Sequence, residues 1–121
     1  MAISFSALTA RLLKPKGRNA FLYSLPPNPR ILDVGCGNNS PALVKRTRPD
    51  CWYIGLDIDD YNQAGASRSL ADEYVTVSSS RFVDAIAQYR NSVDAVISSH
   101  NLEHCDEPLR VLNAMLEALR P

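Results

Sequence analysis

The first 32 residues contain no aspartate or glutamate, although they carry five lysines and arginines. All 13 acidic residues follow this segment, so the net charge of zero conceals an asymmetry. A balanced total charge gives no general attraction for nucleic acid or for an acidic membrane surface. An acid-free basic start is typical of a transit peptide, of a nucleic-acid-binding arm or of a soluble helical segment. We expect the last of these, a basic helical arm over residues 1–29.

Long apolar runs and paired cysteines are also lacking. No apolar run approaches the roughly 20 residues that span a bilayer, and no convincing secretory signal is present. The three cysteines, Cys36, Cys51 and Cys105, are odd in number and far apart, without the spacing of metal ligands. We therefore expect free thiols in a reducing compartment, a cytoplasmic location, and neither a metal site nor a membrane partner.

From residue 30 onward, short segments rich in β-branched residues alternate with helical segments. Strands are predicted at 30–34, 52–58, 74–78 and 93–98, and helices at 4–13, 18–25, 41–48, 62–72, 80–90 and 106–120. Strands that are continuously apolar and alternate with helices indicate βαβ units and a parallel sheet, hence an α/β fold. In the last helix, Asp106 is the predicted cap, Pro108 suits the first turn, and leucines at 109, 112, 116 and 119 repeat at helical spacing.

The first strand leads into the segment ILDVGCGNNS, residues 31–40. In a βαβ unit the end of the first strand faces the start of the first helix, and ligands bind in the crevice between them. Gly35 and Gly37 lack a Cβ, so the chain can turn sharply there and a ligand can approach closely. Ser40 is the predicted cap of the following helix. Asn39 stands where a third glycine is common, and we expect it to tolerate a left-handed conformation.

Two acidic residues suggest which ligand binds there. Asp57 ends the second strand, where an acid about 20 residues after the glycines can accept hydrogen bonds from both ribose hydroxyls. Asp33 lies two residues before Gly35, where a carboxylate would repel a phosphate and suit a cation. S-adenosylmethionine has a ribose, a sulfonium and an amino-acid end but no phosphate, so Asp33 favours this cofactor over NAD. The alternatives are a tight turn without a ligand and a solvated acid at a strand end.

These motifs resemble those of the class I S-adenosylmethionine-dependent methyltransferases of the small-molecule type. ILDVGCG looks like their glycine-rich first motif, and YIGLDI looks like the second, whose acid holds the ribose. VDAVISSHNLEH resembles the fourth-strand motif, and VLNAMLEALRP resembles the helix before the fifth strand. The resemblance covers residues 30–121 and implies a Rossmann-like parallel sheet of order 3-2-1-4. It does not identify the methyl acceptor.

The resemblance also implies roles for individual residues. Those implied to bind the cofactor are Asp33, Gly35, Cys36, Gly37, Asp57, Ile58, Ser98 and Ser99. Among them, Asp57 would hold the ribose and Ile58 would pack on the adenine. Relatives often read the adenine amino group with an acid after the third strand, whereas this chain has serines at 78–80, with Phe82 or backbone groups as other candidates.

Two histidines, His100 and His104, follow the fourth strand. Imidazole titrates near neutrality, so either could act as the catalytic base when the acceptor must lose a proton. The alternative is that they hydrogen-bond the turn before the last helix.

Methyltransferases of this type normally continue past the position of Pro121 with three more strands. We therefore expect residues 30–121 to be the cofactor-binding half of a domain whose fourth strand is an exposed edge. Such an edge leaves three alternatives: an aggregation-prone truncation, a homodimer through this edge, or coverage of the edge by the N-terminal helices. We favour the homodimer. The predicted function is methyl transfer to a small-molecule acceptor. The alternative is a non-catalytic methyltransferase-like module used for assembly or partner binding.

Overall fold

The computed structural model of the chain describes residues 17–58, 68–99 and 101–121. Its elements are α2 (Gly17–Ser24), β1 (Arg30–Val34), α3 (Ser40–Thr47), β2 (Trp52–Asp57), β3 (Glu73–Thr76), the 3₁₀ turn η1 (Ser79–Arg81), α5 (Phe82–Ala87), β4 (Ala95–Ile97), the 3₁₀ turn η2 (Leu102–His104) and α6 (Pro108–Ala118). The helix predicted at 4–13 and most of the helix predicted at 62–72 lie outside the described residues. Among the helices that are described, none has the length and apolar character needed to cross a bilayer.

The four described strands form one parallel sheet in the order β3-β2-β1-β4, as the family resemblance implied. β1 lies between β2 and β4, so that Asp33 pairs with Gly55 on one side and with Ile97 on the other. Because all strands run in the same direction, their carboxyl ends share one edge of the sheet. The segments that follow β1, β2 and β4 therefore emerge side by side, which is where open α/β sheets bind ligands.

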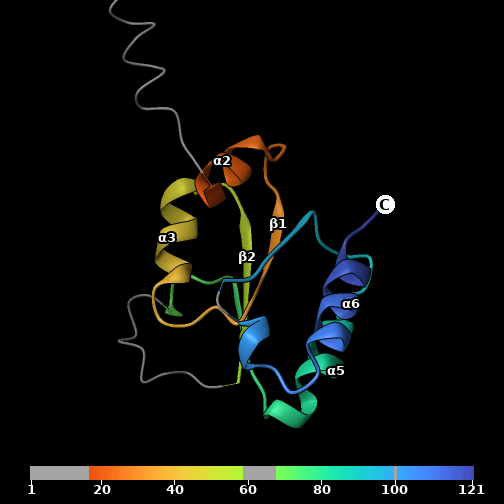
Figure 1. Cartoon of the computed structure of the whole chain (residues 1–121). Helices are drawn as coiled ribbons and strands as arrows, with labels where there is room; N and C mark the ends of the chain where they lie inside the picture. The colour runs from red at the N-terminus through yellow and green to blue at the C-terminus, as the bar shows by residue number, and fades with distance from the viewer. Residues whose placement is uncertain (1–16, 59–67, 100) are drawn as a thin grey trace, which may run out of the picture.

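Helices cover both faces of the sheet, with α3 on one side and α5 and α6 on the other (Figure 1). Alternate residues of β1 serve the two faces, because successive side chains of a strand point in opposite directions. Leu32 and Val34 pack in the cluster that includes α5 and α6, whereas Ile31 packs with Leu22 of α2 and Val44 of α3. The two apolar layers hold β1 rigidly, and with it the loop that follows.

A buried arginine fastens α2 to the layer formed by α3. Arg48 is only 8% exposed. Its Nη1 donates to the carbonyl oxygens of Leu22 at 2.6 Å and Leu25 at 2.9 Å, and its Nη2 donates to that of Pro26 at 2.8 Å. Nε and Nη2 each donate to the Asp50 carboxylate at 2.9 Å. The carbonyl oxygens at the end of α2 therefore accept hydrogen bonds from Arg48, which lies in the turn between α3 and β2.

The core-facing side of α6 differs from the predicted one. Its buried residues are Val111, Ala114, Met115 and Ala118. The leucines at 109, 112 and 116 are exposed instead, by 74%, 37% and 58%. Both sets follow helical spacing, so α6 carries two apolar stripes, and the prediction selected the larger side chains. The buried set of α6 packs against α5.

Neither predicted helix cap forms. α3 begins at Ser40 itself, preceded by Asn39, and α6 begins at Pro108, preceded by Glu107, in both cases without a capping side-chain hydrogen bond. Pro108 occupies the first turn as predicted, but Asp106 lies one residue too early to cap. The hydroxyl of Ser40 has another partner, described below.

Candidate active site

The loop after β1 is tied directly to the end of β2. The backbone N–H groups of Gly35 and Cys36 both donate to the carbonyl oxygen of Leu56, at 2.7 and 3.3 Å. Gly35 and Gly37 have φ angles of 73° and 62°, in the left-handed region that favours glycine. The two predicted glycines are therefore required by the backbone of this turn.

The third position of the motif needs no glycine. Asn39 has a φ of −104°, which any residue can adopt. Asn39 was expected to tolerate a left-handed conformation, but it does not adopt one. The departure from a three-glycine pattern leaves the geometry of the loop unaffected.

Asp57 connects the end of β2 to the same loop. Its Oδ2 accepts a hydrogen bond from the Gly37 N–H at 2.8 Å, and its Oδ1 accepts one from the N–H of Ile58 at 2.7 Å. The residue is only 4% exposed. Each carboxylate oxygen has two lone pairs, so Asp57 can accept further hydrogen bonds from a bound molecule.

Asp33 is enclosed by protein and does not line the pocket described next. It is 2% exposed, and its Oδ2 accepts hydrogen bonds from the hydroxyls of Ser40 at 2.5 Å and Tyr53 at 2.6 Å. Arg18 of α2 donates in turn to the Ser40 hydroxyl at 3.3 Å. Burial raises the pKa of Asp33, although the two hydroxyls act in the opposite direction. The carboxylate thus joins β1, β2 and the start of α3, and supports the loop from within.

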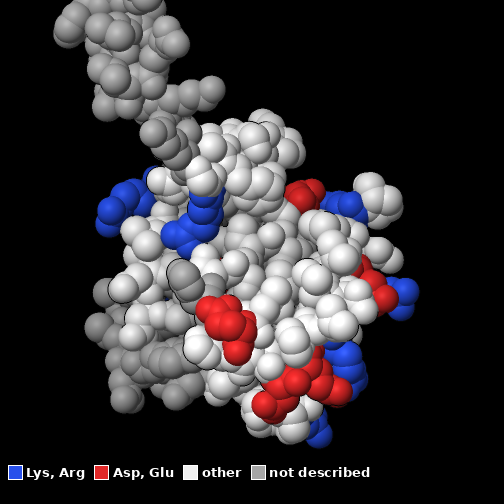
Figure 2. All heavy atoms as spheres, in the orientation of Figure 1, with Lys and Arg blue, Asp and Glu red and all other residues white. Residues whose placement is uncertain are grey.

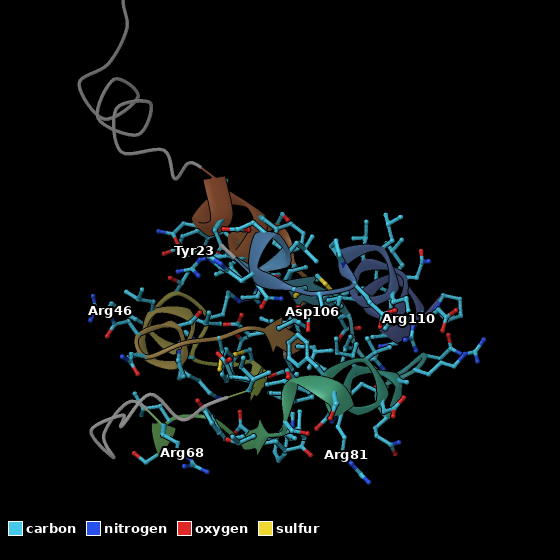
Figure 3. All side chains as sticks on the ribbon, turned by 60° about the horizontal axis from the view of Figure 1, so that its bottom comes forward. Tyr23, Arg46, Arg68, Arg81, Asp106 and Arg110 are labelled. Carbon is cyan, nitrogen blue, oxygen red and sulfur yellow. The ribbon has the colours of Figure 1, made fainter. Side chains whose placement is uncertain are left out.

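A pocket of about 460 Å³ opens at the carboxyl edge of the sheet, within the size range of small-molecule sites. The glycine loop, Asp57 and Ile58 form one wall, and residues between 79 and 84 at the start of α5 form another. Ser99, Asn101 and the segment 104–111 that leads into α6 complete it. Figure 3, which turns this edge toward the viewer, shows Asp106 and Arg110 on the η2–α6 side, with Arg81 pointing outward from the α5 side.

The described lining of the pocket carries an excess of negative charge. Four carboxylates line it, those of Asp57, Asp84, Asp106 and Glu107, against the single guanidinium of Arg110. Arg110 is also paired with Glu107, at 2.7 Å. Figure 2 shows acidic side chains gathered on the lower part of this face, around the start of α6 and α5. A cationic or neutral ligand therefore suits the pocket better than an anion.

Most of the predicted site residues meet at this pocket. Those that line it are Gly35, Cys36, Gly37, Asp57, Ile58, Ser99 and His104. Ser98 instead donates its hydroxyl to the Val34 carbonyl oxygen at 2.8 Å, and faces a shallow groove beside α2. His100 lies outside the described residues.

Cys36 and His104 offer different chemistry to the pocket. Burial raises the pKa of the Cys36 thiol to about 12, and the charge of Asp33 adds to the effect, so the thiol is protonated at neutral pH. The side chain of His104 is 77% exposed, with its Nε2 3.9 Å from the Glu103 carboxylate. The imidazole is therefore accessible to a molecule at the mouth of the pocket.

Tyr53, Asp84 and Asn101 are among the residues of the site that lie outside the predicted set. Tyr53 is one member of an apolar strand, and its bond to Asp33 connects residues 20 positions apart in the sequence. Asp84 lies on α5, and its position in the sequence does not distinguish it from an acid on a solvated helix face. Asn101 carries the clearest signal, because it is a polar residue in the segment between the fourth strand and the last helix.

Known proteins share this arrangement. Residues 32–121 match the family described as methyltransferase domain. The structure is similar to that of a protein described as a methyltransferase from an antibiotic biosynthesis pathway of Anabaena variabilis ATCC 29413, with a TM-score of 0.58 and 18% identity, over 84% of this chain and 40% of that one. It is also similar to the [4+2]-cyclase SpnF, with a TM-score of 0.61 and 22% identity, over 98% of this chain and 44% of that one.

At these identities the two structures show a common fold, and the chain spans less than half the length of either. The family match takes in the glycine loop, Asp57, β4 and α6. Together with the parallel sheet of order 3-2-1-4, this match establishes the family. The chain belongs to the methyltransferase domain family and has the Rossmann-like fold of the class I S-adenosylmethionine-dependent methyltransferases.

Proposed function

We propose that the pocket binds S-adenosylmethionine, and that the chain is the cofactor-binding half of an enzyme that methylates a small-molecule acceptor. The observation that carries this proposal is the pairing of Asp57 with the glycine loop. A buried carboxylate at the end of β2 accepts the Gly37 N–H at 2.8 Å, and both residues line the pocket. An acid in this position can accept hydrogen bonds from ribose hydroxyls while the glycines let the ligand approach the backbone.

The residues of the pocket fit the parts of this cofactor. A Cβ placed on Gly37 would have no neighbour within 4 Å, so there is open space beside the loop. Ser79, Ser80 and Phe82 lie beyond Asp57 and offer hydroxyls and an apolar ring to the adenine. The carboxylates of the lining complement the positive charge of a sulfonium. Asp33 acts in this proposal as a support for the loop.

When bound, the cofactor supplies an activated methyl group for in-line transfer to a nucleophile. The contribution of this chain is to hold the donor in a fixed orientation, which alone supplies much of the rate of such a reaction. We propose His104, exposed at the pocket, as the base for an acceptor that must lose a proton. His100 is the second candidate from the sequence.

A binding measurement tests the proposal. S-adenosylhomocysteine, the product form of the cofactor, is titrated by calorimetry into the wild-type chain and into Asp57→Ala. Loss of hydrogen bonds from the ribose to a charged acceptor should weaken binding by about 1.5–3 kcal/mol, roughly 10- to 150-fold.

Asp94→Asn is the matched control, because Asp94 lies at the opposite edge of the sheet and bonds Arg30 and Arg120. It should bind like the wild type. Equal affinity of Asp57→Ala and wild type would remove the ribose role. A folded wild-type chain that binds no S-adenosylhomocysteine would favour the alternative, a non-catalytic module for assembly or partner binding.

We also propose that two copies associate through the β4 side of the sheet. β4 is the last strand in the order β3-β2-β1-β4, and an unpaired edge invites pairing. The exposed leucines of α6 form an apolar surface that a second copy can also cover. The structure describes the predicted basic arm, residues 1–29, from Gly17 onward. In this part of the arm, α2 and β4 together line a groove.

A further inference from the structure

The two ends of the glycine loop are joined by a hydrogen bond inside the protein. Asp33 lies next to the last residue of β1 and Ser40 is the first residue of α3, so residues 34–39 lie between them. The Ser40 hydroxyl donates to Asp33 Oδ2 at 2.5 Å, and the Tyr53 hydroxyl donates to the same oxygen at 2.6 Å. These bonds fix the separation of the loop ends, and with it the position of Gly35 and Gly37 at the pocket.

Arg18 reaches this hydrogen bond from α2. Its Nη1 donates to the Ser40 hydroxyl oxygen at 3.3 Å, so the group that donates to Asp33 is itself bound by a cation. Leu22 of α2 is buried in the apolar cluster shared with α3, and Arg48 binds the carbonyl oxygens at the end of α2. Helix α2 therefore holds Arg18 in place, although Arg18 does not line the pocket.

The surroundings of Asp33 contain one cation. Within the described part of the chain, the titratable and charged groups that face it are Arg18 from α2, Cys36 from the loop, and Tyr53 and Asp57 from β2. The neighbours that α3 and β4 supply are the uncharged Ser40 and Ile97. Burial, with the charge of Asp33, raises the pKa of the Tyr53 hydroxyl and of the Cys36 thiol, so both stay protonated at neutral pH.

The charge of Asp33 decides how strongly the loop ends are joined. Burial raises the pKa of Asp33, and the charge of Asp57 acts in the same direction, whereas the two hydroxyls and the Arg18 guanidinium lower it. Hydrogen bonds to an ionised carboxylate are roughly twice as strong as those between neutral groups. Protonation of Asp33 therefore weakens both of the bonds that it accepts.

We infer that Arg18 is a positioning residue for the ligand, whose guanidinium stabilises the Asp33 carboxylate and, through it, the glycine loop in the conformation that binds. This inference rests on the proposed function. The apparent affinity of a ligand falls with the fraction of molecules in the binding-competent conformation. Affinity should be highest above the pKa of Asp33 and should fall as the pH falls through it. Loss of the Arg18 charge raises this pKa, so it moves the fall in affinity to a higher pH.

A pH series of calorimetric titrations tests the inference. S-adenosylhomocysteine is titrated into the wild type and the variants at acid to neutral pH values at which circular dichroism shows each chain to be folded. The wild type should bind about tenfold more weakly at the acid end, as expected when hydrogen bonds to a charged group become neutral. Arg18→Gln should match the wild type at the neutral end and lose affinity at a higher pH. Arg18→Lys, which keeps the charge, should retain the wild-type profile.

Two further variants separate the charge of Asp33 from other effects. Arg46→Gln removes the charge of an exposed arginine on α3 and should leave the profile unchanged. Asp33→Asn keeps the size of the side chain but cannot ionise, so it should bind about tenfold more weakly than the neutral wild type and lack the fall in acid. Other titrating groups, such as His104, contribute equally to this variant. Adding Arg18→Gln to Asp33→Asn should cause no further loss.

A role of Arg18 in docking α2 alone predicts a different result. Arg18→Gln would then lose the same factor of affinity at every pH, and this outcome would overturn the inference. A flat wild-type profile, or a further loss in the double variant, would also overturn it while leaving the proposed function in place. If Arg18→Gln does not fold, Asp33→Asn decides, because a fall in acid equal to that of the wild type excludes Asp33. A folded wild type that binds no S-adenosylhomocysteine at any pH would overturn the proposed function and, with it, this inference.

Discussion

Gly35 and Gly37 form a matched pair for testing how the glycine loop works. Both have left-handed φ angles, so an alanine at either position meets the same backbone strain, about 1–2 kcal/mol. Their surroundings differ completely. A Cβ on Gly37 would have no neighbour within 4 Å, whereas a Cβ on Gly35 would be 2.5 Å from two atoms of Asn101 and 2.8 Å from its Cβ.

The two substitutions should therefore act on different properties. Gly35→Ala must displace the Asn101 side chain, and overpacking of this kind adds about 1–3 kcal/mol to the backbone strain. We expect its free energy of unfolding to fall by about 2–5 kcal/mol in total, against about 1–2 kcal/mol for Gly37→Ala. Gly37→Ala should instead lose affinity for S-adenosylhomocysteine, because its methyl group enters the open space beside the loop.

Urea unfolding gives the free energies, and calorimetric titration gives the affinities. The double variant Gly35→Ala/Asn101→Ala removes both atoms at 2.5 Å and leaves the Cβ contact at 2.8 Å, so it should recover part of the loss. Equal destabilisation by the two single substitutions would show that the Asn101 contact has no energetic weight. A double variant no more stable than Gly35→Ala would lead to the same conclusion.

Other parts of the structure give further expectations. Arg48→Met should lower the free energy of unfolding by about 1–3 kcal/mol in urea, because it leaves the carbonyl oxygens at the end of α2 without their donor. The Arg120 side chain and the Arg30 N–H hold the pKa of Asp94 below its ordinary value of 3.8. The unfolded chain therefore binds more protons in acid, so this contribution to stability is present above pH 4 and is lost as the pH falls below it. Asp94→Asn should flatten that part of the pH–stability curve, and an unchanged slope would contradict the assignment. If the exposed leucines of α6 take part in the association of two copies, Leu116→Glu should yield a monomer by light scattering, and an unchanged dimer would exclude this helix from the contact.

The strands were predictable because their signal is local. β1 was predicted at 30–34 and observed there, and β2 differs from its prediction by one residue. Both are continuous apolar runs between turn residues, which only a strand buried on two faces requires. The order of the sheet, in contrast, came from the resemblance of four motifs to a known family.

The site was predictable where backbone geometry dictates the residue type. Gly35 and Gly37 occupy left-handed positions, and Asp57 lies at a strand end beside them. The predicted environment of Asp33 and Ser40 was less accurate, because a carboxylate near a ligand crevice and one inside the core have the same local sequence. The hydroxyl of Tyr53, which is distant in the sequence, bonds Asp33 and holds this carboxylate inside the core.

Helix α6 shows a different limit of sequence reasoning. Its leucines satisfy the helical period as well as its buried residues do, and side-chain size favoured the wrong face. Which stripe turns inward depends on the elements that pack against the helix, and the period alone carries no information about them.

The three amides of residues 35–37 all donate to the end of β2, two to the Leu56 carbonyl oxygen and one to the Asp57 carboxylate. This turn therefore has the rigidity of a strand rather than that of a surface loop. Its conformational entropy is already lost when the domain folds, so a ligand does not have to order it on binding. We expect these amides to exchange their hydrogens with solvent as slowly as those of β1, and only when the centre of the sheet itself opens.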